Sequence, residues 1–253
     1  MGTVASLDVR DADVPVAALD EAFAWLHEAD RRFSAWQPAS EVSRFGRGEI
    51  ALDDASADLR EILRDCEALR DLSDGAFDAE RWRPDSRPDP TGLVKGWAAE
   101  RAGLILDAAG LRTWCLNVGG DVIVRGHPEP AGWRVGIRDP LDATRVAFVL
   151  ELADLAVATS ATYERGSHLV DPRTGRPADG LRSLTVIGPR LTWADGYATA
   201  AWVMGLDGVA WVAGIPGYDA GAIAHDGSLL ASDRFLARIA GHAQPADRAG
   251  GPG

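Results

Sequence analysis

Residues 113–125 read TWCLNVGGDVIVR, two short β-rich runs separated by a pair of glycines. A Gly-Gly pair between two such runs is typical of a two-residue hairpin turn. Gly119 and Gly120 would also let the backbone approach a ligand closely, although the hairpin is the simpler interpretation. The pair is not a GxGxxG dinucleotide fingerprint, because no helical segment follows it. This stretch therefore predicts an antiparallel pair of strands.

Working outward, β-rich and helical runs alternate with segments rich in Gly, Pro and charge. The expected strands cover residues 113–118, 121–125, 133–137, 145–152, 155–159, 183–187, 221–225 and 228–231. The expected helices cover residues 14–33, 56–72, 96–109, 192–204 and 207–212. Residues 34–49 and 78–90 are expected to be loops. We expect an α+β fold of mostly antiparallel sheets flanked by helices, with one globular domain over residues 1–243 and a flexible tail over 244–253.

The composition excludes several classes of protein. The 253 residues include 26 Lys+Arg and 38 Asp+Glu, for a net charge of −12, which argues against a non-specific nucleic-acid binder. Apolar runs stop well short of a membrane span, so no membrane insertion is expected. Cys66 and Cys115 lie far apart and form neither a CxxC motif nor a disulfide scaffold. The first residues lack the pattern of a signal peptide, which predicts a cytoplasmic protein and leaves a trimmed exported form open.

The segment DPTGLVKGW (residues 89–97) places Lys95 between two glycines at the expected opening of a helix. Free N–H groups and the helix dipole attract anions there, so Lys95 is a candidate phosphate contact. A plain turn followed by a helix start explains the same residues. The spacing is not that of a Walker A motif, and a P-loop is excluded.

Residues 159–175 combine hydroxyls, a histidine, an arginine and an Asp-Pro turn within a short stretch. His168 is a candidate general base, since an unperturbed imidazole titrates near neutral pH. A structural histidine with satisfied hydrogen bonds is the alternative. The Asp171-Pro-Arg-Thr-Gly turn is a weak signal when taken alone.

Asp195 and Thr199 are four residues apart in WADGYAT (residues 193–199), so a helix would place their oxygens on one face. A carboxylate and a hydroxyl in this arrangement can share Mg²⁺, a cation that prefers oxygen ligands. An Asp195 that merely caps the helix N-terminus is the alternative.

Several short motifs occur in one order along nearly the whole chain. They are MGT (1–3), FSAW (33–36), SEVSR (40–44), GAFD (75–78), GLVKGWA (92–98), NVGGD (117–121), ATS (158–160), HLVDPRTG (168–175) and ADGYATA (194–200). This series resembles the ApbE family of flavin transferases. The resemblance implies a T-fold-related α+β domain that binds FAD with Mg²⁺. It also implies transfer of FMN from FAD to a Ser or Thr hydroxyl of an acceptor flavoprotein, with release of AMP.

The resemblance also implies roles for individual residues. Asp195 and Thr199 match the metal ligands, together with a backbone carbonyl of the Gly92–Lys95 turn, taken as that of Val94. His168 matches a candidate base for the acceptor hydroxyl, and Asp195 is the alternative base. Positions around the dinucleotide pocket are matched by Met1, Lys95, Gly119, Gly120, Asp121, Ser160 and Asp171.

Two residues depart from the family pattern: Ala161 follows Thr-Ser where Gly is common, and Gly46 replaces a usual Asn. Some family members hydrolyse FAD to FMN and AMP, so an FAD pyrophosphatase is an alternative function in the same site. A carrier that binds FAD without turnover is a third hypothesis, which the presence of metal ligands and a base disfavours. The sequence does not separate a monomer from a homodimer.

Overall fold

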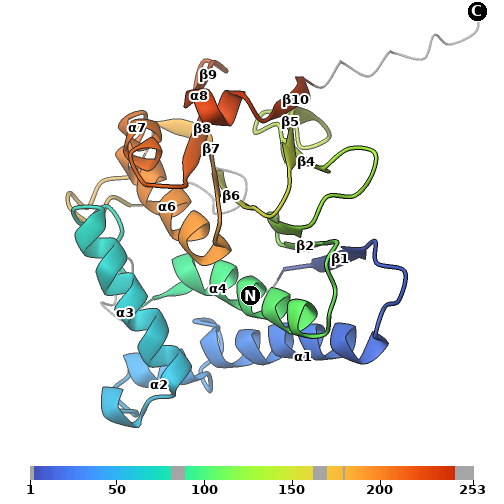
Figure 1. The fold of residues 1–253 in the computed structure, drawn as a ribbon. Coiled ribbons are helices and arrows are strands. Elements are labelled where there is room, and N and C mark those ends of the chain that lie inside the picture. The colour runs from blue at the N-terminus through green and yellow to red at the C-terminus, as the bar shows by residue number, and fades with distance from the viewer. Residues whose placement is uncertain (1–2, 81–88, 162–169, 179, 243–253) are drawn as a thin grey trace, which may run out of the picture.

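The computed structural model describes residues 3–80, 89–161, 170–178 and 180–242 and shows two antiparallel sheets with helices over one of them (Figure 1). The larger sheet has seven strands in the order β1 (Ala5–Val9), β2 (Trp114–Val118), β3 (Asp121–Arg125), β6 (Ala156–Ala161), β7 (Leu181–Gly188), β8 (Asp219–Ala224) and β9 (Leu229–Ala231). The smaller sheet has the order β10 (Ile239–His242), β5 (Val146–Leu152) and β4 (Trp133–Arg138). The expected α+β fold with antiparallel sheets is confirmed.

The hairpin expected at residues 113–125 joins β2 and β3. Val118 pairs with Asp121, and the two-residue turn between them has Gly119 at φ 62° and Gly120 at φ 96°. Two successive positive φ angles give the turn a twist that matches the flanking strands, and glycine adopts them without a Cβ penalty. The hairpin interpretation is confirmed.

Two apolar cores lie on opposite faces of the larger sheet. Side chains alternate along each strand, so Ile123 of β3 faces the helices while Val122 and Val124 face the smaller sheet. Trp133, Phe148 and other inward residues of the smaller sheet complete that second core. The helix-covered face contains the predicted site.

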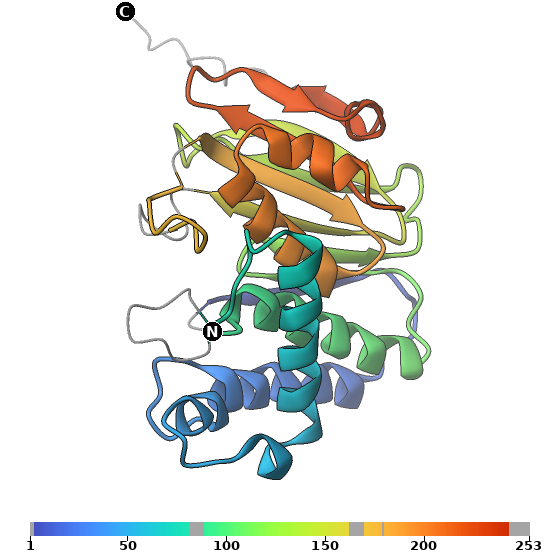
Figure 2. The same cartoon turned by 90° about the vertical axis from the view of Figure 1, so that its left-hand side faces the viewer.

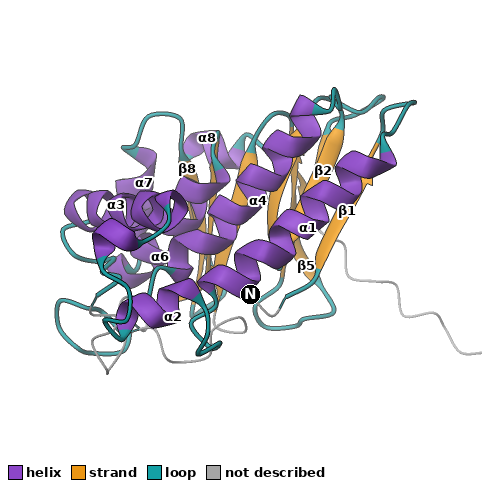
Figure 3. Ribbon diagram, turned by 90° about the horizontal axis from the view of Figure 1, so that it is seen from below, coloured by secondary structure: helices purple, strands orange, loops and turns teal. Residues whose placement is uncertain are grey.

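Helices cover the first face in a fixed arrangement. They are α1 (Val16–Phe33), α2 (Glu41–Gly46), α3 (Ala57–Leu72), α4 (Thr91–Ala108), α6 (Leu191–Met204) and α7 (Asp207–Ala213), with a 3-10 turn at Leu52–Asp54. The short helix α8 (Asp233–Leu236) belongs to the other face, where its Phe235 joins the second core. Helices α1 and α4 run side by side, and α3 stands across them (Figure 2). Figure 3 shows α1 and α4 lying over the strands. In the described part of the chain, no helix is both long enough and apolar enough to cross a membrane.

Some expected boundaries are wrong. Helix α4 begins at Thr91 and not at Gly96, because the Asp89 carboxylate accepts from the Thr91 N–H at 3.1 Å and the Pro90 carbonyl accepts from Leu93 N–H. Thus the supposed Gly92–Lys95 turn is the first part of a helix. The segment 34–49 is also not wholly a loop, since Ser40 accepts from Ser43 N–H and starts α2.

Besides α2 and the 3-10 turn, three described elements were not expected: edge strands β1 and β10 and the four-residue helix α8. Each is short, and neighbouring elements supply the contacts that define it. Strand β1 alternates half-buried with exposed residues as it pairs with β2. The predicted C-terminal tail lies outside the described residues, and the domain limits stay a prediction.

Candidate functional site

The site lies at the contact between α4 and α6, which pack closely through glycines. The ring of Phe77 lies over Gly92, where an added Cβ would stand 2.7 Å from it and 3.7 Å from Thr199 Cγ2. An added Cβ at Gly96 would be 2.5 Å from the Leu191 carbonyl oxygen and 3.0 Å from Asp195 Cβ. Gly92 therefore faces Thr199, and Gly96 faces Asp195. We call this contact the α4–α6 seam.

The carboxylate of Asp195 reaches across the seam. It is 2% exposed, and its Oδ2 accepts from Gly96 N–H of α4 at 3.0 Å. Asp195 lies in the interior of α6, whose N-cap is Arg190. The alternative of Asp195 as an N-cap is therefore wrong, and its carboxylate is held between two helices.

Thr199 lies one turn further along α6 on the same face. Its side chain is fully buried, and its hydroxyl oxygen has no hydrogen-bond partner among the described residues. A buried hydroxyl without a partner costs about 1–3 kcal/mol. Such an atom beside a carboxylate fits an oxygen ligand of a hard cation.

The protein would provide few side-chain ligands to the predicted metal ion. No three His, Cys, Asp or Glu residues cluster as a metal site within the residues that the structure describes. Asp195 and Thr199 offer two oxygens, and the carbonyl of Val94 in α4 is the third predicted ligand. A helical carbonyl keeps a second lone pair after its helix bond. Mg²⁺ commonly completes such a set with waters or substrate phosphate, so the residues present fit the ion.

Lys95 and Asp121 form a buried ion pair next to the seam. Lys95 Nζ is 2.9 Å from Asp121 Oδ2, and the two side chains are 17% and 1% exposed. Asp121 also accepts from Thr159 N–H of β6 at 3.3 Å. The carboxylate therefore fixes the lysine head between α4 and the sheet. A lysine ammonium has three N–H donors and can contact more than one acceptor at a time.

The remaining predicted pocket residues lie on β6 and at the β2–β3 hairpin. Ser160 is buried on β6 and, by strand alternation with Ala156 and Ala158, faces the helices. Gly119 packs against Thr3, and its N–H donates to the Val4 carbonyl at 2.9 Å. Asn117 accepts from Gly120 N–H at 2.9 Å, which holds the hairpin tip.

Asp171 opens a tight turn next to a cavity. Its backbone carbonyl accepts from Gly175 N–H at 2.8 Å, and its carboxylate accepts from Arg173 Nε at 2.9 Å and Nη2 at 3.0 Å. The hydrogen bonds from Arg173 hold the pKa of Asp171 below its ordinary value. Asp171 thus orients Arg173, which sequence reasoning missed.

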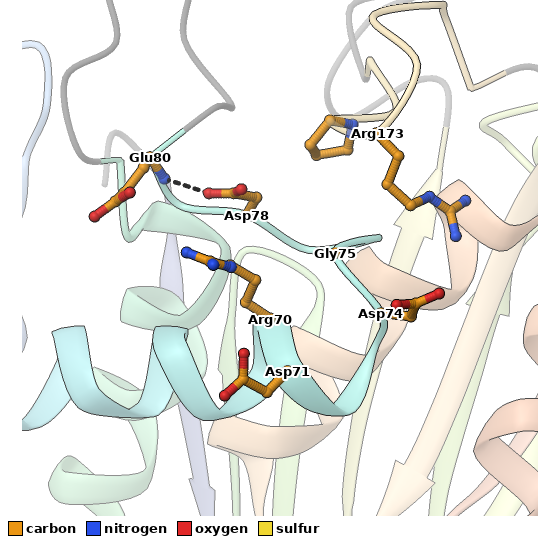
Figure 4. Close-up of a pocket in the computed structure, with 8 residues that line it drawn as sticks. Arg70, Asp71, Asp74, Gly75, Asp78, Glu80 and Arg173 are labelled. Atoms are coloured by element: carbon orange, nitrogen blue, oxygen red, sulfur yellow. Dashed lines mark hydrogen bonds between the residues drawn. The ribbon is translucent and has the colours of Figure 1, made fainter.

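The cavity has a volume of about 780 Å³ and a polar wall. It is lined by Arg70, Asp71, Asp74, Gly75, Asp78, Glu80, Pro172 and Arg173. In Figure 4, Arg173 extends toward the side of Asp74, opposite the segment that holds Asp78 and Glu80. Phe77 of that segment contacts Gly92, so the cavity wall adjoins the seam. In the sequence, the GAFD motif indicates one side of this cavity and the HLVDPRTG motif, which contains Pro172 and Arg173, indicates the other.

Two predicted residues, Met1 and His168, lie outside the described residues. The structure brings Lys95, Asp121, Asp195 and Thr199 to the same helix-covered face as Ser160. A second residue missed from sequence is Glu100, whose carboxylate contacts the start of α6. Its partner, Thr192, is 92 positions away, and no local pattern indicates such a pair.

The fold agrees with comparisons to known proteins. A model of the ApbE family matches residues 1–82 and 79–220. The chain therefore belongs to the ApbE family.

Relatives include a protein named FAD:protein FMN transferase from Rhodobacter capsulatus, 33% identical over 194 residues, which span 73% of this chain and 37% of that protein. A Vibrio cholerae protein of the same name is 27% identical over 71% of this chain and 71% of its own. A third from Treponema pallidum is 28% identical over 93% of this chain and 74% of its own. The chain thus matches little more than a third of the first relative's length.

Solved structures share the fold. The flavin transferase ApbE from Vibrio cholerae aligns with a TM-score of 0.79 at 24% identity, over 94% of this chain and 96% of the other. The ApbE protein from Thermotoga maritima aligns with a TM-score of 0.81 at 23% identity, over 94% and 96%. At this identity the likeness establishes the fold alone.

Proposed function

We propose that this protein is a Mg²⁺-dependent FAD:protein FMN transferase. It would move FMN from FAD to a Ser or Thr hydroxyl of an acceptor flavoprotein and release AMP. The observation that carries the proposal is the α4–α6 seam in a chain of the ApbE family. There the Asp195 carboxylate lies on one buried helix face with the Thr199 hydroxyl, which has no hydrogen-bond partner among the described residues.

The chain's own residues suit this reaction. Asp195, Thr199 and the Val94 carbonyl would hold Mg²⁺, which supplies charge neutralisation for the pyrophosphate when bound. Lys95 is oriented by Asp121 and would donate to a phosphate oxygen. The Gly96 N–H bond orients the Asp195 carboxylate toward α4, which favours the ligand role over the role of base.

The proton would go to His168, the remaining candidate base. The acceptor hydroxyl oxygen forms a bond to the phosphorus of the FMN half, and His168 takes the hydroxyl proton. The bond from that phosphorus to the bridging oxygen breaks, and AMP leaves with the electron pair. Lys95 would offset the charge that develops on the phosphates.

The experiment is an incubation of the full chain with FAD, MgCl₂ and a flavoprotein acceptor domain. An acceptor mass raised by one FMN, together with an equal amount of AMP, is the expected result. FMN and AMP in solution without an adduct would replace the transferase with an FAD pyrophosphatase. FAD that binds but yields no AMP would overturn both in favour of a carrier. EDTA should stop the reaction, and MgCl₂ in excess should restore it.

A further inference from the structure

Helix α6 carries both predicted metal-binding side chains, yet its N-terminus has no local cap. Its N-cap residue, Arg190, makes no capping hydrogen bond with its side chain. The first N–H groups of a helix need an outside acceptor, and a buried end without one is unstable. The acceptor here comes from another helix.

Glu100 of α4 supplies that acceptor. Its Oε2 accepts from Thr192 N–H at 3.0 Å and from the Thr192 hydroxyl at 2.7 Å. Its Oε1 accepts from Arg190 Nε at 2.7 Å. The Glu100 side chain is only 14% exposed, while that of Arg190 is 54% exposed. One carboxylate therefore holds the first turn of α6 against α4 with three hydrogen bonds.

These bonds fix the register of the seam. Gly92, Gly96 and Glu100 are spaced by four residues along α4. Gly92 faces Thr199, Gly96 faces Asp195, and Glu100 contacts Thr192. The two glycines permit a close approach but present no side chain that would resist sliding. Glu100 is the polar contact at the end of this row, and its partner Thr192 lies about one helical turn before Asp195 on α6.

We propose that Glu100 is a positioning residue for the metal site: its cap on α6 fixes where Asp195 and Thr199 stand relative to α4. This inference rests on the proposed function; Glu100 is not itself a predicted ligand and would act through Asp195 and Thr199. Removal of groups that orient metal ligands typically lowers metal affinity or activity about 10- to 100-fold.

The test compares Glu100→Ala with Glu61→Ala, since both carboxylates tie α4 to a neighbour. Glu61 accepts from Arg101 Nη2 at 2.7 Å and from Trp97 Nε1 at 3.3 Å, away from α6. The probe is Mn²⁺ alone, titrated against each protein and followed by the electron paramagnetic resonance signal of the free ion. We expect E100A to weaken Mn²⁺ binding at least about tenfold and E61A to leave it unchanged. Equal, wild-type Mn²⁺ affinity in both variants would overturn the positioning role.

Two further variants keep the result interpretable. Glu100→Gln retains an acceptor for Thr192 N–H and should weaken Mn²⁺ binding less than E100A. This variant still tests the positioning role if the alanine variant does not fold.

Thr199→Val should also lose Mn²⁺ binding. If T199V binds as the wild type does, the metal assignment in the proposed function fails. If T199V is weak and both Glu100 variants are normal, only the positioning role fails. Transfer of FMN is measured separately, and its absence in the wild type would overturn the proposed function whatever the Mn²⁺ results.

Discussion

Helices α3 and α6 start in opposite ways. At the start of α3, Ser56 caps the helix by accepting from Leu59 N–H at 3.1 Å, three residues further along the chain. Arg32 and Glu41 surround that cap from α1 and α2. At the start of α6, the acceptor is Glu100, which is 92 residues from Thr192. The first helix is defined by its own sequence and the second by its neighbour.

The two helices also differ in role: α3 mainly stabilises the fold, whereas α6 contains the predicted site. Helix α3 buries one stripe, formed by Leu59, Ile62, Cys66 and Leu69, and exposes the rest. Helix α6 is buried on nearly all sides and holds a carboxylate in the seam, together with a hydroxyl that has no partner in the described part of the chain. Such buried polar groups lower stability and are retained where function needs them. Loss of the cap of α3 should therefore lower stability and leave activity unchanged. Loss of a polar group of α6 in the seam should lower activity without lowering stability.

The largest effect is expected for Thr199→Val, which removes the hydroxyl and keeps the shape. FMN transfer should fall by at least about 100-fold, because a predicted metal ligand is lost. The free energy of unfolding should stay the same or rise by about 1 kcal/mol, because an unpartnered buried polar atom disappears. Activity assays and thermal unfolding of the same preparation measure both quantities.

Thr199→Ser is the matched control, since it restores the hydroxyl and should recover most of the transfer activity. A valine variant that keeps full activity but unfolds more easily would show that the hydroxyl has a structural role. The seam would then resemble the start of α3, and the contrast between them would disappear.

Gly96→Ala tests how closely the seam is packed. The new Cβ would meet the Leu191 carbonyl oxygen at 2.5 Å, and neither backbone can move without the other. We expect a loss of about 1–3 kcal/mol in unfolding free energy, despite alanine's better helix propensity, together with weaker FMN transfer.

Gly136→Ala on β4 is the control for this glycine. Its Cβ would meet the Val146 methyl carbons at 3.4 Å, which is an ordinary van der Waals distance. Its unfolding free energy should change by less than about 0.5 kcal/mol, as for most surface substitutions. A Gly96 variant as stable as this control would indicate a loosely packed seam.

The same contrast decides what could be predicted from the sequence. Helix α3 follows from Ser56 and a regular apolar stripe, and the β2–β3 hairpin follows from Gly119 and Gly120, because each signal lies within a few residues. The spacing of Asp195 and Thr199 likewise predicts their shared face. Helix α4 was expected five residues too late, since Gly92 and Gly96 disfavour a helix in isolation and are accepted only because α6 and Phe77 pack there.

Contacts between distant residues could not be predicted. The pairs Lys95–Asp121 and Glu100–Thr192 join residues whose proximity is set by packing of whole elements. A carboxylate on a helix is usually a solvated side chain, and nothing around Glu100 in the sequence distinguishes it from Glu61. The site's motifs were visible because they are local, and its supporting contacts were not because they are tertiary.

A smaller effect is expected for Ser56→Ala, the counterpart of Glu100 at the start of α3. Loss of a serine cap typically costs about 1 kcal/mol, so the thermal midpoint should fall by about 2–4 °C. FMN transfer and Mn²⁺ affinity should not change, because α3 carries no predicted ligand. If Ser56→Ala weakened Mn²⁺ binding as strongly as Glu100→Ala does, the two helix starts would be coupled, and a cap lost anywhere among these helices would disturb the seam.

The smallest effect is expected for Glu41→Gln, which sharpens the comparison through pH. Glu41 is partly buried, which by itself raises the pKa of its carboxyl, but hydrogen bonds from Ser56 and the charge of Arg32 outweigh burial and lower it. A carboxyl whose pKa is lowered by folding stabilises the protein above the pKa of the unfolded chain, about 4.3 for Glu, and loses this contribution as the pH falls through the folded value.

Glutamine at position 41 keeps an acceptor for Ser56 N–H and lacks the charge. The variant should therefore be less stable than the wild type by about 0.5 kcal/mol at pH 7, and the two should converge below about pH 4. Urea unfolding at pH 7, 5 and 3.5 measures the gap. A gap that stays constant over this range would mean that the hydrogen bonds of Glu41, and not its negative charge, stabilise the start of α3.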